Sequence, residues 1–100
     1  MRKYKRQLNS KYEEIELIGK VVYHDTSVCV SIDGIVSKDA QLIGVALMNA
    51  MVCQQCVVEK GTVVEIWLED FDYGRYDTDT FEELLIEVCK EFSINLNLYN

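Results

Sequence analysis

An apolar stripe near the C-terminus sets the strongest limit on how this chain can fold. Its members recur at the i, i+3, i+4, i+7 and i+11 positions that share one side of an α-helix: Phe81, Leu84, Leu85, Val88 and Phe92. Most of the charged residues of the same segment fall off this stripe: Glu82, Glu83, Glu87, Lys90 and Glu91. Thr80, followed three residues later by Glu83, fits a capping box and predicts the start of the helix. A helix that is apolar on one side must pack on a core, so the chain is expected to fold around it.

Alternating apolar and polar residues predict strands in several other segments. Residues 14–24 and 28–33 alternate in this way, and so do residues 62–69 and 94–99. The pair Asp33-Gly34 suits a two-residue hairpin turn, after which Ile35–Val36 would form a short third strand. The alternation therefore predicts five strands, three of them before the middle of the chain.

The middle of the chain predicts a second helix. Ser37 is a plausible N-cap, and residues 40–56 lack the alternation of a strand and are apolar on most sides. The end of this helix is left open, because Val57 and Val58 also suit a loop, and residues 59–61 form a break. The small residues Gly44, Ala46 and Ala50 would allow another element to approach closely, which makes the helix a candidate homodimer interface.

The predicted element order is β-β-β-α-β-α-β. This order indicates an α+β fold with an antiparallel or mixed sheet of four to five strands and two helices on one face. One hundred residues suit one domain, which we place at residues 13–100, preceded by a flexible basic arm at residues 1–12.

The charge of the chain is polarised. Residues 61–100 contain ten acidic and two basic side chains, a net charge of −8, whereas the first sixty contain eight basic and seven acidic ones. The arm either stays solvated or folds against this acidic end, and direct binding to nucleic acid is not expected of so acidic a chain. No apolar run is long enough for a membrane span and no export signal is recognisable, so a cytoplasmic protein is expected.

Residues 32–92 resemble the histidine-containing phosphocarrier proteins of the sugar phosphotransferase system. The resemblance lies in the hairpin at residues 32–36, the helix containing residues 42–48, the strand at residues 60–66 and the amphipathic last helix. It implies a fold element but no active residue, because the phosphohistidine segment Gly-Leu-His-x-Arg-Pro-Ala of that family is absent. The alternative function that it implies is phosphoryl or small-ligand handling, with His24 or Ser37 as the phosphate acceptor.

Other residue patterns that could carry chemistry are weak. The spacing of Cys53 and Cys56 is that of a metal or redox pair, but zinc needs four ligands and the pair falls near a predicted helix C-terminus, so buried thiols are the preferred interpretation. His24 beside Asp25 could form a general-base pair, but it also suits a turn. The loop at residues 70–79 lacks the bidentate glutamate of a calcium site. No catalytic residue, metal ion or cofactor is therefore predicted, and the chain is not expected to be an enzyme.

The same loop combines aromatic residues, carboxylates and one arginine, a combination that binding hot spots favour. Its rings either face a partner or fold back onto Trp67. We predict a regulatory protein, of the type of a phage or mobile-element inhibitor, that binds a protein partner with a basic surface through an acidic, aromatic-containing C-terminal surface. The predicted contact residues are Asp70, Phe71, Asp72, Tyr73, Arg75, Tyr76, Asp77, Asp79, Glu83 and Glu87.

Overall fold

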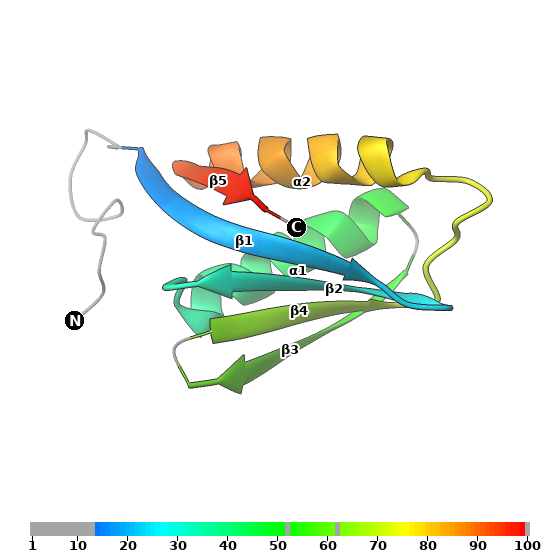
Figure 1. Ribbon diagram of the computed structural model, residues 1–100, viewed down its shortest axis with the longest axis horizontal. Coiled ribbons are helices and arrows are strands. Elements are labelled where there is room, and N and C mark those ends of the chain that lie inside the picture. The colour runs from blue at the N-terminus through cyan, green and yellow to red at the C-terminus, as the bar shows by residue number, and fades with distance from the viewer. Residues whose placement is uncertain (1–13, 52, 62, 100) are drawn as a thin grey trace.

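The computed structural model describes residues 14–51, 53–61 and 63–99, and for residues 55, 56 and 58–60 it describes the backbone alone. The predicted basic arm at residues 1–12 lies outside these ranges. Seven elements follow one another along the chain (Figure 1): β1 (Ile15–Tyr23), β2 (Ser27–Asp33), α1 (Ser37–Met51), β3 (Gln54–Lys60), β4 (Val63–Glu69), α2 (Thr78–Glu91) and β5 (Ile94–Leu98).

The strands form one mixed sheet in the order β3-β4-β2-β1-β5. Neighbouring strands are antiparallel except for β1 and β5, which run parallel with Ile15 opposite Ile94. The chain reaches β5 from β4 through α2, because two parallel strands need a long crossover connection. The predicted α+β class with a mixed sheet is thus confirmed.

The predicted element order is wrong in two places. Ile35 and Val36 form no strand: the chain turns at Gly34, which has φ of 87°, and enters α1 at Ser37, while the Ile35 side chain is buried in the core. The segment predicted as the end of the middle helix and the break after it is β3, so the observed order is β-β-α-β-β-α-β. This segment contains β-branched residues and pairs with β4 across Gly61, whose φ of 64° favours glycine at the turn.

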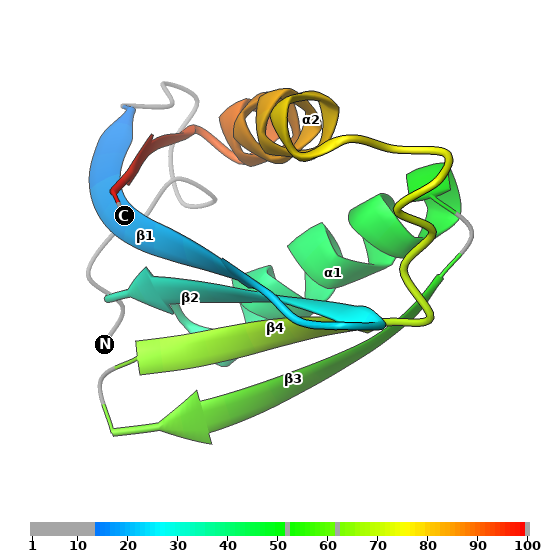
Figure 2. The same cartoon turned by 45° about the vertical axis from the view of Figure 1, so that its right-hand side comes forward.

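Both helices cover the same face of the sheet (Figure 2). α1 packs on β3 and β4, and α2 packs on β5 and on α1. Between the helices and the sheet lies one core, whose largest fully buried apolar side chains are Phe81, Ile32, Ile43, Leu47, Met51, Ile66, Leu68, Leu85, Ile94, Val28 and Val30. The stripe that predicts α2 lies on this core through Phe81, Leu85 and Val88, with Leu84 and Phe92 partly buried at its edge.

Neither α1 nor α2 has the length and apolar character that a bilayer-spanning helix requires, and no other helix occurs in the described part of the chain.

Candidate functional site

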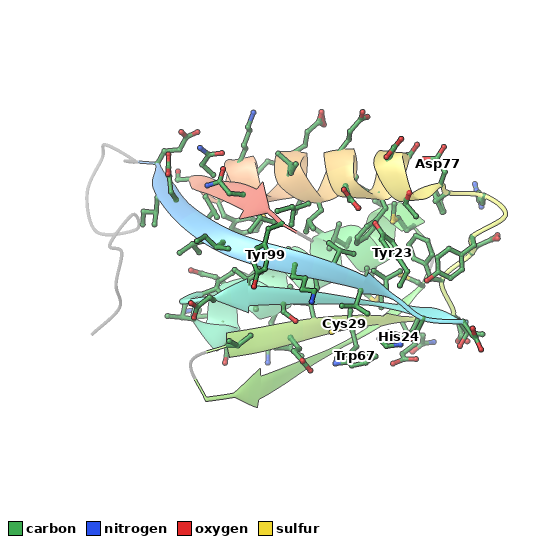
Figure 3. All side chains as sticks on the ribbon, in the orientation of Figure 1. Tyr23, His24, Cys29, Trp67, Asp77 and Tyr99 are labelled. Carbon is green, nitrogen blue, oxygen red and sulfur yellow. The ribbon has the colours of Figure 1, made fainter. Side chains whose placement is uncertain are left out.

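The outward side of α2 carries a stripe of exposed carboxylates. Asp79, Glu83, Glu87 and Glu91 recur every fourth residue and are all exposed, so they follow one another along one side of the helix about 6 Å apart. Figure 3 shows the side chains of α2 that point away from the sheet. We call these four residues the acidic stripe. Glu91 was missing from the predicted contact residues, although its spacing from Glu87 indicates that it belongs with them.

The like charges of the acidic stripe oppose the stability of their own helix, although Asp79 itself lies in the first turn, where the helix dipole favours an anion. Carboxylates at i and i+4 repel each other and destabilise a helix by about 0.2–0.5 kcal/mol per pair. Glu91 also lies at the helix C-terminus, where the helix dipole favours cations, and Lys90 is the one basic residue within α2. A cationic partner that binds along the stripe would reduce this repulsion, so binding would stabilise the helix.

Asp77 caps the N-terminus of α2. Its backbone is extended, with φ of −82° and ψ of 171°, and its Oδ1 atom accepts a hydrogen bond of 2.7 Å from the Thr80 backbone N–H. Hydrogen bonds from Thr80 lower the pKa of the Asp77 carboxyl. The prediction that Thr80 caps the helix is therefore wrong. The N-cap is Asp77, and the backbone N–H of Thr80 is the group that it caps. One oxygen of Asp77 is engaged within the chain, which leaves this residue a structural role beside its predicted contact role.

Replacing Asp77 by alanine is expected to lower the thermal midpoint at neutral pH, because the amide of Thr80 loses its acceptor. The pKa of the carboxyl is lower in the folded than in the unfolded chain, so its stabilising effect is fully present well above the ordinary value of 3.8. That effect is lost as the pH falls through the lower folded value. Thermal melts between neutral and acidic pH should show the wild type and Asp77→Ala converging in acid. Asp77→Asn, which keeps an acceptor without the charge, should differ less from the wild type, and equal effects of the two variants would contradict the assignment.

The aromatic loop before α2 is fastened to the body of the domain. Phe71 is 6% exposed, and its ring packs edge-on against Phe81 at 5.4 Å and against Tyr73 at 5.0 Å. The Tyr73 hydroxyl lies 2.7 Å from the carbonyl oxygen of His24 and 2.8 Å from that of Ser27, so its proton is shared between the two acceptors at the β1–β2 turn. The Phe71 N–H donates to the Thr26 carbonyl at 2.9 Å. These contacts hold the loop in one place.

The predicted contact role of the rings therefore needs correction. Phe71 is buried and offers no surface to a partner. The alternative prediction, that the rings of the loop fold back onto Trp67, is wrong about the residue: Phe71 packs on Phe81, and Tyr73 packs on Tyr23. Trp67 points to the other side of the sheet, where it stacks on the His24 ring at 5.1 Å and 24°. Local sequence could not foresee this choice, because the partners of the loop lie in distant elements.

The remaining predicted contact residues of the loop are accessible. Asp70, Asp72 and Arg75 are exposed, and Tyr76 is half-buried. The Tyr76 hydroxyl donates to the Ala50 carbonyl at 3.4 Å, and the Arg75 guanidinium lies 5.5 Å from the centre of the Tyr76 ring. Asp72 accepts a hydrogen bond of 3.0 Å from the Gly74 N–H, which shapes the turn. The loop thus adds two exposed carboxylates, Asp70 and Asp72, to those of α2.

A contact that the sequence did not predict fixes the first turns of α2 against the sheet. The Tyr23 hydroxyl donates a hydrogen bond of 2.5 Å to Oε2 of Glu82. Burial raises the pKa of Tyr23, and the hydrogen bond to Glu82 raises it further, so the phenol stays protonated as a donor. The half-buried Glu82 is therefore engaged in a hydrogen bond within the domain, while its neighbour Glu83 is exposed. No sequence signal joins these residues, which are 59 positions apart.

No protein-family model matches the sequence, and the comparison with curated proteins finds no match. The functional inference therefore rests on the residues themselves.

The other candidate chemical residues lie apart from one another. His24 is exposed at the β1–β2 turn and Ser37 begins α1, so the two phosphate acceptors of the alternative function lie at opposite ends of β2. Burial raises the pKa of the Cys53 thiol and raises that of Cys89 to about 12, which disfavours the reactive thiolate form at both positions. The sequence predicts Cys56 near the end of a helix, but the structure places it in β3. Within the described ranges, no three His, Cys, Asp or Glu side chains gather as metal ligands would.

Proposed function

We propose that this chain is a small non-catalytic interaction protein that binds a basic protein partner through the acidic stripe of α2 and the loop before it. The observation that carries the proposal is the stripe: four exposed carboxylates, each within reach of the next, on a helix that they destabilise. Asp70 and Asp72 extend the negative surface along the loop.

The charge balance of the domain supports the same partner chemistry. Residues 14–100 contain sixteen acidic and five basic side chains, so a cationic partner is attracted from a distance and a negative one is repelled. Charge complementarity of this kind speeds association and selects against wrong partners.

A partner that normally binds nucleic acid fits this surface best. DNA presents one phosphate for about every 3.4 Å along each strand, and the stripe presents one carboxylate for about every 6 Å along the helix. Lysine and arginine side chains that bind a phosphate backbone can therefore bind this sparser row of carboxylates instead. An inhibitor that occupies such a partner, as a phage or mobile-element protein would, is the form of regulation that we propose.

The rigidity of the surface supports binding without prior folding. The Tyr23–Glu82 and Tyr73–carbonyl hydrogen bonds fix α2 and the loop against the sheet before any partner arrives. A preformed surface loses less conformational entropy on binding than a mobile one does. The half-buried Tyr73 and Tyr76 remain at the edge of the acidic residues, beside the exposed Arg75.

The test is a paired charge reversal. Glu83→Lys/Glu87→Lys reverses the centre of the stripe, and Glu14→Lys/Glu16→Lys makes the same change of net charge at exposed positions off α2. Each tagged protein is used to capture partners from a lysate of the native host, with mass identification and with short duplex DNA as a competitor. We expect a nucleic-acid-binding protein to be retained by the wild type and by the control, displaced by DNA, and lost, by about tenfold or more, with the α2 variant.

Loss of capture in this variant would not reflect unfolding. The two reversals place one lysine four residues after Asp79 and another four residues before Glu91, so each end of the stripe gains a pair of opposite charges. Residues 83 and 87 still repel each other and residue 87 now repels Lys90, so the net gain should be about 0.5 kcal/mol and the helix should be at least as stable as in the wild type. Urea unfolding followed by circular dichroism measures this gain. Capture that is equal for the α2 variant and the wild type would refute the proposed surface.

A further inference from the structure

The face of the sheet opposite the helices is partly apolar. Among the residues that the structure describes, five large apolar side chains are well exposed, and three of them lie on this face or at its edge: Ile18 at 56%, Val22 at 36% and Tyr99 at 56%. The face also carries Trp67, which is half-buried. An antiparallel sheet with one solvated face normally alternates polar residues outward. Exposed apolar side chains that gather on one face mark an interaction site.

The strand register arranges the centre of this face in three rows. Each row runs from β1 across β2 to β4, so that β2 lies in the middle. The rows are Val22–Cys29–Trp67, Lys20–Ser31–Glu65 and Ile18–Asp33–Val63. In each row the residues on the two sides of β2 are chemically matched: apolar with apolar in the outer rows, and cation with carboxylate in the central one.

We infer that a second copy of this chain packs face to face on this side of the sheet, about a two-fold axis that follows β2 between the two sheets. Such an axis exchanges the two sides of β2, so residues of β1 in one copy lie opposite residues of β4 in the other. Lys20 then faces Glu65 of the second copy, and this contact occurs twice. Val22 packs against Trp67 of the second copy, and Ile18 packs against Val63. The surface is thus complementary to itself, which is what an isologous dimer needs.

The charged groups of the three rows agree with this arrangement, with one exception. Glu65 accepts a hydrogen bond of 3.0 Å from the Trp67 Nε1 atom, and a carboxylate has several lone pairs, so Lys20 of the other copy can approach it as a further donor. Asp33 belongs to β2, which lies along the axis, so it would approach Asp33 of the second copy. It is exposed at the end of β2, where its carboxylate can turn outward to solvent. Asp33→Asn should therefore tighten the dimer.

The size of the face is sufficient. Five strands spaced by about 4.8 Å, with a length of about 23 Å for seven residues, cover about 500 Å² in projection. The accessible surface of protruding side chains exceeds the projection, which brings the face into the range of about 800 Å² per partner that stable interfaces bury. Packed sheets keep their mean strand directions within about 30° of each other, and an axis along β2 satisfies this. In this dimer both α2 helices remain on the outside, because they cover the opposite faces of the two sheets.

The middle helix, which the sequence indicates as a dimer interface, suits that role less well. Gly44 is buried within the domain, so it offers no close approach to a second copy. Leu42 and Val45 are the large exposed apolar residues of α1, at 47% and 38%. They provide a matched control surface for the experiment.

The experiment measures mass in solution and then exchanges the central charges. Light scattering after gel filtration and sedimentation equilibrium, at up to about 100 µM, should give twice 11.6 kDa for the wild type. Lys20→Glu and Glu65→Lys should each raise the dissociation constant of the dimer at least about tenfold, because each places like charges opposite each other. The double variant Lys20→Glu/Glu65→Lys should return to within about threefold of the wild type. Leu42→Ser/Val45→Ser should leave the dimer unchanged.

Three outcomes would overturn the inference. A wild-type monomer would do so, whether the face is then covered by residues 1–13 of the same chain or by another protein. A dimer that survives Lys20→Glu but dissociates in Leu42→Ser/Val45→Ser would place the interface on α1. Two folded single variants that dissociate without rescue in the double variant would refute the two-fold axis along β2. None of these outcomes alters capture by the acidic stripe, so the dimer and the proposed function are tested separately.

Discussion

Replacing Phe81 by alanine is expected to lower the free energy of unfolding by about 3–5 kcal/mol. Phe81 is fully buried in the first turns of α2, and its ring contacts those of Phe71 at 5.4 Å and Tyr23 at 6.4 Å. Alanine would remove the apolar surface that joins the helix, the loop and the end of β1. It would also leave a cavity between these three segments, and a shift of one segment alone cannot fill it.

Urea unfolding followed by circular dichroism measures the loss, with Ile86→Ala as the control because Ile86 is half-buried on the same helix. Hydrogen exchange should show faster exchange at the Phe71 amide in the Phe81 variant, because the loop loses the ring against which it packs. Equal destabilisation by the two substitutions would show that Phe81 does not hold these elements together.

Replacing Gly19 by valine is expected to cost about 2–3 kcal/mol. A Cβ atom at position 19 would lie 2.9 Å from Cδ1 of Leu96 and 3.1 Å from the carbonyl oxygen of Ser31. The Leu96 side chain can shift, but the Ser31 carbonyl belongs to the backbone of β2 and moves only with that strand. Because β1 lies between β2 and β5, the added side chain forces apart the centre of the sheet and its parallel edge.

Gly74→Val is the matched control, because residue 74 is exposed and a Cβ there would meet the Asp72 side chain at 3.3 Å and nothing else within 4 Å. Thermal and urea unfolding should show a small effect in the control and a large one at position 19. A Gly19→Val protein as stable as the control would contradict the close packing of Leu96 over β1.

The acidic stripe shows how far sequence reasoning reaches toward the candidate site. Glu83 and Glu87 were predicted to point outward because the apolar stripe of α2 fixes which side of the helix is buried. The same period places Asp79 and Glu91 on the exposed side. The cap of this helix could not be assigned as reliably, because Asp77 and Thr80 both suit that position and the loop geometry decides between them.

The loop shows where sequence reasoning stops. The sequence is equally compatible with Phe71 and Tyr73 as contact residues or as core residues. Their packing on Phe81 and on the β1–β2 turn decides between these two roles. β3 was missed for a similar reason. Its residues show no clear alternation, and they become a strand through pairing with β4.

Residue patterns along the chain are enough to define the helix α2, the faces of β1, β2 and β4, and the concentration of negative charge at the C-terminal end, because helical and strand periods are local properties. Four other features follow from the folded arrangement alone: the existence of β3, the parallel pairing of β5 with β1, the inward turn of Phe71 and the bond between Tyr23 and Glu82. These features depend on partners that are distant in the sequence or on pairing with another strand. Their free energy comes from burial and hydrogen bonds that exist only once the separate segments have met.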